Sequence, residues 1–292
     1  MAISRAQLVK ELEPGLNALF GLEYKRYDNQ HAEIYTNESS DRAFEEEVML
    51  SGFANANVKV EGSGVNYDQS QETYTARYTH DTIALAFAIT EEAIEDNLYD
   101  KISSRYTKAL ARSMSNAKQV KAAAPLNNGL PTADGFDSGD GVSLFNTSHT
   151  TVSGTSVKNT LTTQADLNET SLEQALIDIA AFTDERGLRV AAKGMKMIIP
   201  SANQFSAERL LKSQGRTGTA DNDINAVASM GMVPQGYRVN NFLTDSDSWY
   251  IITDVPNGMK MFTRAPLTTA MEGDFDTGNV RYKARERYSF GV

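Results

Sequence analysis

The sequence contains no cysteine and only three histidines among its 292 residues. Without cysteine the chain has no disulfide, no thiolate ligand for a metal and no cysteine nucleophile. The histidines, His31, His80 and His149, are far apart, and none belongs to a His-x-His or His-x-x-x-His pair that could hold a metal ion. We therefore predict that the protein has no cofactor and that its stability comes from packing and association.

Positive charge is also scarce, because 28 Lys and Arg residues face 38 Asp and Glu residues, a formal net charge of −10. General nucleic-acid binders neutralise phosphates with cations, so this balance argues against that class. The longest apolar run, IALAFAI at 83–89, is too short to span a bilayer, and the first residues lack the apolar segment of a secretion signal. We expect a soluble protein made in a cytoplasm, with no membrane partner.

Catalytic motifs are missing too. Ser148 and His149 are adjacent, but no Gly-x-Ser-x-Gly elbow is present, and neighbouring residues do not readily form a serine–base pair. Two acidic stretches, 221–225 and 274–276, lack the glycine and glutamate of a calcium loop, and Gly62-Ser63-Gly64 has no lysine after it and is read as a hairpin tip. The sequence therefore predicts a protein that is not an enzyme, with a Ser148/His149 hydrolase as the alternative.

Residues 4–20 have the periodicity of a short amphipathic helix, which we expect to be interrupted at Pro14-Gly15. Its apolar stripe includes Leu8 and Leu12. An N-terminal segment with one apolar stripe lies on its own domain or on a neighbour. Leu8 and Leu12 are therefore candidate contacts between subunits.

Residues 46–89 are typical of extended chain. The stretch NVKVEGSGVNYD predicts a hairpin around its Gly-Ser-Gly turn, and residues 72–89 alternate along a ribbon of about 60 Å. The outer part of this ribbon has no apolar face, so it cannot be stable alone. We predict that it projects and lies on another subunit, with candidate contacts at Lys59, Tyr74, Arg77 and Tyr78.

Residues 90–124 predict one long helix. Thr90 is a suitable N-cap, and the charges run from acidic in the first turns to basic in the rest, as the helix dipole favours. Apolar residues recur every three to four positions, and Pro125 is expected to end the run. At about 50 Å, this helix would cross the whole molecule.

Residues 126–168 are rich in Gly, Ser, Thr, Asn and Asp and predict a loop region that could hold a short hairpin. Helices and strands follow. We expect a capping box at Thr170 for a helix that ends at Gly187, and Ser201 as the cap of a second helix. Strands are expected at 196–199 and within 236–243, 248–254 and 258–267.

The chain closes on a basic ribbon, DFDTGNVRYKARERYSF at 274–290. Its residues alternate from Val280 on, so one face of a strand would be largely apolar and the other would carry four cations, Arg281, Lys283, Arg285 and Arg287. These are balanced by four acidic residues, Glu272, Asp274, Asp276 and Glu286. The balance suits pairing with carboxylates of the same chain or the next one, and direct contact with DNA is the alternative.

A set of stretches carries a family resemblance: AITEEAIEDNLYDKISSRYTKALARSM, LFNTSH, DERGLRVA, RLLKSQ with TADNDIN, FLTDSDSWYI and EGDFDTGNVRYKARERYSFGV. With the order of parts, they resemble the major capsid proteins of tailed phages with the Hong-Kong-97-type fold, and above all the phage-Mu-type major head subunit group. The resemblance implies an α+β fold. It divides the chain into an N-terminal arm at 1–45, an extended-loop hairpin at 46–82, a peripheral domain at 83–165 and 266–292 with spine helix 90–124, and an axial domain at 166–265.

The resemblance also implies a structural function. Such a protein self-assembles into pentamers and hexamers that form the icosahedral shell of a virion around double-stranded DNA, without sequence-specific binding, in the cytoplasm of a host bacterium. The implied partners are a separate scaffolding protein, since Met1 opens directly on the arm, a portal and a decoration protein. The cations Arg281 to Arg287 join the candidate subunit contacts.

Two further expectations depend on the resemblance. Some relatives cross-link covalently through a lysine of the extended loop and an asparagine elsewhere. Lys59 is the only lysine in 46–89, but the sequence nominates no asparagine partner, and we expect no cross-link. The alternative function within the same fold is the shell of an encapsulin-type nanocompartment around a cargo enzyme.

Overall fold

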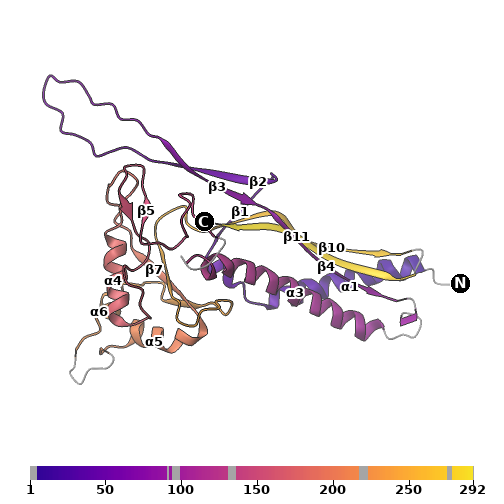
Figure 1. Ribbon diagram of the computed structural model, residues 1–292. Coiled ribbons are helices and arrows are strands. Elements are labelled where there is room, and N and C mark those ends of the chain that lie inside the picture. Colours follow the sequence, from indigo (N-terminus) through magenta and orange to yellow (C-terminus); the bar gives the residue numbers. More distant parts are fainter. Residues whose placement is uncertain are drawn as a thin grey trace.

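The computed structural model describes residues 5–90, 92–93, 99–130, 136–216, 223–274 and 278–291, apart from the side chains of 5–12 and 99–102. Figure 1 shows an elongated molecule with three parts. A long sheet with two helices forms a limb, a compact α/β body lies at one end of this limb, and a loop projects beyond the sheet.

The limb is built on a four-stranded sheet with the order β1-β10-β11-β4. Its strands are β1 (Thr36–Ser39), β4 (Asp81–Ile89), β10 (Lys260–Gly273) and β11 (Val280–Gly291). β11 is antiparallel to both of its neighbours, and β1 is parallel to β10. The predicted last strand is therefore confirmed, and it lies in the interior of the sheet.

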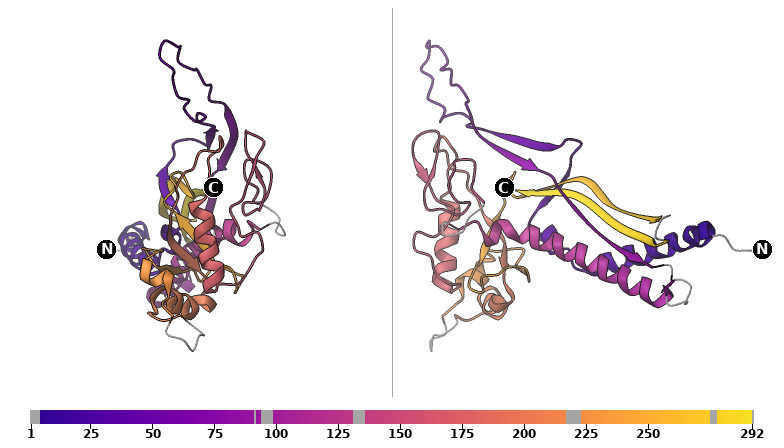
Figure 2. Two further views of the ribbon diagram at one scale, coloured as in Figure 1. Left: turned by 90° about the vertical axis from the view of Figure 1, so that its left-hand side faces the viewer. Right: turned by 45° about the vertical axis from the view of Figure 1, so that its right-hand side comes forward.

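Two helices cover one face of this sheet, α1 (Arg5–Arg26) and α3 (Tyr99–Asn127), as the right-hand view in Figure 2 shows. The core between the layers is made by buried side chains, including Leu16, Phe20, Leu110, Met114 and Tyr282. A short 3-10 helix, Gln30–Glu33, leads from α1 to β1. The described part of α3 confirms the long helix, and the turns expected at 94–98 lie outside the described residues.

Both helices continue past a proline that was expected to stop them. α1 is continuous through Pro14, because Pro14 and Gly15 are exposed and the missing hydrogen bond faces solvent, while Leu16 and Phe20 anchor the helix on the sheet. α3 runs through Pro125 to Asn127, because proline fixes φ at a helical value and can be followed by a last short turn. The predicted interruption at Pro14-Gly15 and the end before Pro125 are wrong.

The projecting loop rises from a two-stranded sheet of β2 (Phe44–Leu50) and β3 (Glu72–Thr79). Between them, residues 51–71 contain no regular strand, although a turn is present at Gly62, where φ is +82°. The turn expected at Gly-Ser-Gly is therefore present, but the two hydrogen-bonded strands expected beside it are not. The ribbon expected from 72 to 89 also divides at His80, so that β3 and β4 belong to different sheets.

The compact body has a three-stranded sheet, β8-β7-β9, made by β7 (Gly194–Ile199), β8 (Tyr237–Val239) and β9 (Tyr250–Thr253). Three helices pack around it, α4 (Glu169–Ala180), α5 (Gln204–Lys212) and α6 (Ala226–Met230). A small hairpin, β5 (His149–Thr150) with β6 (Ser156–Val157), confirms the one expected in the loop region.

The helix caps of the body differ from those predicted. Asn168, and not Thr170, begins α4, because Asn168 is extended and its side chain accepts from Ser171 N at 2.9 Å while Ser171 Oγ accepts from Asn168 N at 3.0 Å. α4 ends at Ala180, and Gly187 lies in a later turn with φ of +84°. α5 follows a 3-10 turn at Ser201–Asn203, whose Ser201 makes no capping bond.

Candidate assembly interface

The last strand gives the limb sheet two unlike faces. Its Val280, Tyr282, Ala284 and Tyr288 are buried toward the helices, while Arg281, Lys283 and Arg285 are exposed on the other face. The predicted alternation of β11 is therefore present. We call the exposed side, away from α1 and α3, the outer sheet face.

The outer sheet face is cationic. Lys283 lies between Ala86 of β4 and Ala270 of β10, and Arg285 lies between Ala84 and Thr268. Small neighbours leave both cations standing above the sheet. Within the described ranges neither has a carboxylate partner, so the predicted pairing of these two residues inside the chain is not seen.

The other two cations of the ribbon are placed differently. Arg281 pairs with Asp274, the acidic residue at the start of the same ribbon. Arg287 is half-buried and its Nε has no hydrogen-bond partner among the described residues. The four-cation face predicted from the sequence thus contains one internal pair, one partly buried residue and two free cations.

A buried ion pair fastens the helices to the sheet. Lys118 Nζ of α3 is 3.0 Å from Glu286 Oε2 of β11, and Tyr24 of α1 donates to the same oxygen at 3.4 Å. Lys118 Nζ also lies 4.9 Å from the ring centre of Tyr288. Burial, and then Glu286, raises the pKa of Tyr24 well above its usual range. Sequence reasoning missed this cluster, although Glu286 has the same parity in the strand as buried Tyr282.

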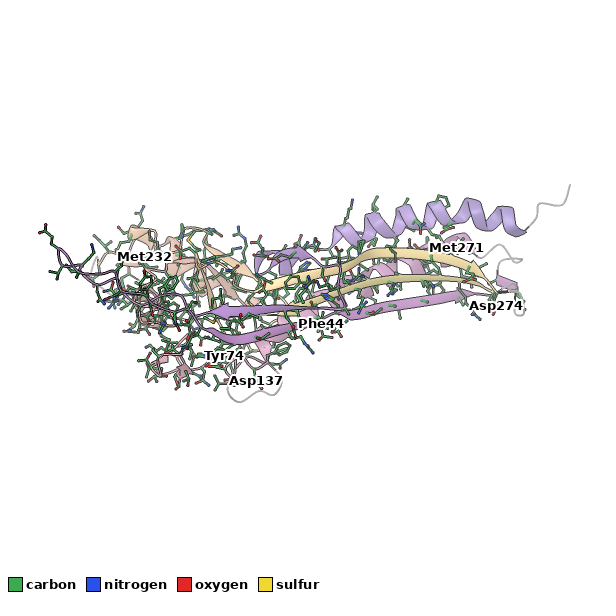
Figure 3. The ribbon with its side chains drawn as sticks, turned by 90° about the horizontal axis from the view of Figure 1, so that it is seen from above. Phe44, Tyr74, Asp137, Met232, Met271 and Asp274 are labelled. Atoms are coloured by element: carbon green, nitrogen blue, oxygen red, sulfur yellow. The ribbon has the colours of Figure 1, made fainter. Side chains whose placement is uncertain are left out.

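The base of the projecting loop is tied to the limb by charge and packing. Lys260 of β10 pairs with Glu47 of β2, and its Nζ is 3.5 Å from Glu38 of β1. The hydrogen bond to Glu47 raises the pKa of Lys260. Tyr78 is buried against Phe262, with ring centres 4.9 Å apart. Seen from above in Figure 3, Phe44 and Tyr74 lie near this base, and Met271 and Asp274 mark the far end of the sheet.

His80 marks the point where the loop strand becomes a limb strand. Its Nε2 is 2.9 Å from Ser40 Oγ and its Nδ1 is 3.0 Å from Ser289 Oγ. Ser40 donates to Glu45 at 2.6 Å, so it accepts from Nε2–H, and Nδ1 accepts from Ser289. Burial, and then Arg287, lowers the pKa of His80. These buried hydrogen bonds fix the break in the predicted ribbon.

Most side chains of the projecting loop are exposed to solvent. Among residues 51–71, the exposed fractions are 94% for Val58 and 95% for Tyr67, and three other apolar residues are exposed, Phe53, Val60 and Val65. Lys59 is exposed as well, and no ion pair joins it to the residues that the structure describes. An apolar segment this bare is typical of a surface that another molecule covers.

Tyr74 and Arg77, two other residues of the hairpin that the sequence predicts as subunit contacts, bind residues of their own chain. Tyr74 donates to the carbonyl of Thr150 at 2.8 Å, which joins the hairpin to the compact body. Arg77 lies 2.6 Å from Glu46 and stacks 4.3 Å from the centre of the Phe44 ring. Leu8 and Leu12 lie on α1, and their side chains are outside the description.

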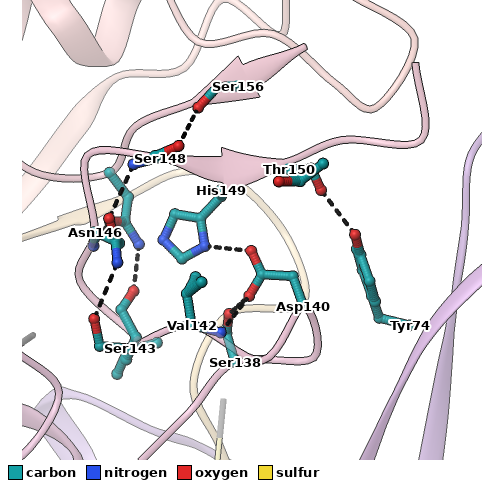
Figure 4. A network of polar contacts seen from close by, with 12 residues as sticks. Tyr74, Ser138, Asp140, Val142, Ser143, Asn146, Ser148, His149, Thr150 and Ser156 are labelled. Carbon is teal, nitrogen blue, oxygen red and sulfur yellow. Dashed lines mark hydrogen bonds and ion pairs between the residues drawn. The ribbon is translucent and has the colours of Figure 1, made fainter. Parts of the chain in front are cut away.

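The Ser148/His149 alternative finds little support in the geometry. His149 Nδ1 is 2.9 Å from Asp140 Oδ2, but Ser148 Oγ points to Ser156 Oγ at 2.8 Å (Figure 4). His149 Nε2 is buried without a hydrogen-bond partner among the described residues, so no serine is in line to be activated. Ser138 and His149 lower the pKa of Asp140 against the effect of its burial.

The described residues contain no group of three or more His, Asp or Glu side chains placed to hold a metal ion. They also contain no helix that is long and apolar enough to cross a membrane.

Solved structures of capsids and of a virus-like particle have a similar architecture. The capsid of an empty GTA particle aligns with a TM-score of 0.55 at 14% identity, covering 91% of this chain and 87% of that one. The capsid of Myoviridae phage XM1 aligns with a TM-score of 0.52 at 12% identity, covering 89% of this chain and 85% of that one. A virus-like particle from Pyrococcus furiosus aligns with a TM-score of 0.52 at 11% identity, covering 95% of this chain and 93% of that one. At these identities the likeness concerns the fold, and it confirms the predicted α+β, Hong-Kong-97-type class.

Sequence comparison identifies the family. The search of curated proteins gave no match. A family model described as phage capsid protein matches residues 73–292, which is well over half of the chain and includes strands β4, β10 and β11 of the limb sheet and the whole compact body. The chain therefore belongs to the phage capsid protein family, and it is a major capsid protein, a structural subunit of a phage head.

Proposed function

We propose that the chain assembles with itself into pentamers and hexamers, which tile an icosahedral head around double-stranded DNA. The observation that carries this proposal is the projecting loop, whose apolar side chains are largely exposed to solvent. The division into arm 1–45, extended loop 46–82, peripheral domain 83–165 with 266–292, and axial domain 166–265 is part of the proposal. So is membership of the phage-Mu-type group.

The proposed contact is between the loop of one copy and the outer sheet face of the next. Val58, Val60 and Val65 would cover the strip of small residues beside β11, which removes apolar surface from water on both sides. The loop hairpin also exposes Glu61 and Glu72, which are opposite in charge to Lys283 and Arg285. This arrangement gives the free cations of the ribbon their carboxylates across a subunit boundary.

Further partners follow from the same proposal. A separate scaffolding protein, a portal and a decoration protein complete the head, which assembles in the cytoplasm of a host bacterium and becomes the capsid of the virion. The DNA inside is held without sequence specificity. The protein acts as a structural subunit without catalytic activity, in agreement with the orientation of Ser148 away from His149.

The nanocompartment alternative uses the same fold, so the fold does not separate the two. The family match to phage capsid proteins favours the phage head. Proteomics of the contents of purified shells distinguishes them, because a nanocompartment holds one dominant enzyme and a phage head does not.

Charge reversal tests the contact itself. Lys283→Glu with Arg285→Glu should leave a folded, monomeric or small-oligomeric protein that forms no shells, because the outer sheet face then repels Glu61 and Glu72 of the loop hairpin. The matched control is Arg189→Glu with Lys193→Glu, two exposed cations of the compact body. Shells from the first variant in the yield of the control, counted by sedimentation, would refute the proposed contact.

A further inference from the structure

The long helix α3 is cationic in an acidic protein. From residue 103 to its end it carries five Lys and Arg residues and no Asp or Glu. Two of these, Lys118 and Lys121, reach the sheet and pair with Glu286 and Asp81. Structural pairing therefore accounts for only part of the positive charge of the helix.

The remaining three cations form one stripe. Arg105, Lys108 and Arg112 are three and four residues apart, which places them on the same side of the helix over about 10 Å. All three are exposed, and no carboxylate pairs with them among the side chains that the structure describes. Leu110, Ala111 and Met114 of the same helix are buried toward the sheet, so the stripe faces away from it.

The stripe borders a groove between the two helices. This groove, of about 540 Å³, is lined by Lys108 and Arg112 of α3 together with Glu23 and Tyr27 of α1. Among the described residues that line the groove, the carboxylate is Glu23, which is buried, accepts from Tyr27 at 3.2 Å and is 3.7 Å from Arg26. Lys25 and Arg26 are exposed at the end of α1. The helical layer therefore presents a basic surface.

This surface lies opposite the projecting loop, because α1 and α3 cover the other face of the limb sheet (Figures 1 and 2). We infer that the helical layer faces the inside of the head and that Arg105, Lys108 and Arg112 bind the phosphate backbone of the enclosed double-stranded DNA. The inference rests on the proposed function, which uses the outer sheet face for contact between subunits.

The chemistry of the stripe is suited to weak binding of duplex DNA. Arginine guanidinium groups bind phosphate oxygens in pairs, and lysine adds a point charge, so three side chains neutralise about three phosphates per copy. Such contacts carry no base sequence. Many copies act together in a shell, which retains the DNA, while each contact exchanges quickly enough for the genome to enter and leave.

The test is the salt dependence of duplex binding by the unassembled, full-length chain. The variant Arg105→Gln/Lys108→Gln/Arg112→Gln is compared with Arg189→Gln/Lys193→Gln/Arg209→Gln, which removes the same charge from exposed positions of the compact body. With a fluorescent DNA duplex, the log of the association constant falls as log salt rises. The steepness of this slope should decrease by about 2.7 for the helix variant, at about 0.9 per phosphate contact, and stay near the native value for the control. Equal slopes in the two variants would overturn the inference.

Shells provide the second readout. Nuclease-treated particles of the helix variant should retain less nucleic acid than those of the native chain and of the control variant. Unchanged retention with an unchanged slope would refute DNA binding by the stripe. Failure of the native chain to form shells would instead contradict the proposed function, and the duplex measurement would still decide the inference.

Discussion

Lys118 Nζ and Glu286 Oε2 lie 3.0 Å apart in the core of the limb, where the two side chains are only 15% and 2% exposed. The pair joins the long helix to β11, one of the two inner strands of the sheet, and Tyr24 adds a hydrogen bond from the first helix. Because both charges are removed from water, each depends on the other.

Removing one partner of the pair should be costly. Lys118→Met leaves Glu286 buried without its cation, and we expect the free energy of unfolding of the unassembled chain to fall by about 3–5 kcal/mol. Urea unfolding followed by circular dichroism measures it. The matched control is Lys121→Met, whose partner Asp81 is 58% exposed, and there we expect a loss below about 1 kcal/mol.

Replacing both partners should restore most of the loss. In Lys118→Met/Glu286→Leu no charge is left in the core, so we expect a free energy of unfolding well above that of the single variant. Equal losses for Lys118→Met and Lys121→Met, or a double variant no more stable than the single one, would contradict the role given to the pair.

Truncating the projecting loop should separate folding from assembly. Ser51 N donates to Gln71 O at 2.9 Å, so residues 53–69 can be replaced by an Asn-Gly turn without removing this closing contact. The melting temperature should change little, because the loop adds few contacts to the core, whereas shells should no longer form in sedimentation analysis. Lys59→Gln, in a loop of full length, should still give shells if no cross-link is needed.

Acid should destabilise the chain partly through His31. Burial, and then Lys118, lowers the pKa of His31 from 6.5 to about 4 in the folded chain, and Gln119 hydrogen-bonds its Nδ1 at 3.0 Å. The unfolded chain therefore takes up this proton first, so the stability is complete above pH 6.5 and is lost as pH falls toward 4. His31→Asn keeps an acceptor for Gln119 and should show a smaller drop in melting temperature between neutral and acidic pH. The same drop in both proteins would rule this out.

The cap of α4 gives a test between two readings of the same helix. Asn168→Ala should lower the free energy of unfolding by about 1 kcal/mol, because it removes the acceptor of Ser171 N. Thr170→Ala, which alters the residue favoured by the sequence pattern, should have little effect. A larger loss for Thr170→Ala would show that the observed cap is not the stabilising one.

Much of the limb could be predicted because its signals are periodic. The alternation from Val280 and the apolar spacing of the long helix both follow from burial of one face, and the structure has both elements. Caps and breaks were less predictable. Two prolines were expected to stop helices that tertiary packing carries past them, and the break at His80 depends on Ser40 and Ser289, which are distant in sequence.

The contacts of the interface residues were also not predictable from the sequence pattern, because they depend on residues in other elements. Pattern alone placed four cations on one face. The structure adds that Lys283 and Arg285 lie beside small residues, without a carboxylate partner among the described residues, while Arg281 pairs with Asp274. Glu286, the buried partner of Lys118, could not be recognised from the sequence for a similar reason. A glutamate at an inward position looks like a break in the apolar pattern until the helix that carries its cation is placed beside it.

The proposed function requires that this chain build a closed shell from copies of itself. Negative-stain electron microscopy of the purified full-length protein would show such shells. We predict closed, roughly spherical particles of uniform diameter, with pentameric and hexameric clusters on their surface, and none from the protein with 53–69 replaced. A native preparation that holds only monomers and small oligomers, or shells formed equally well without the loop, would contradict the account.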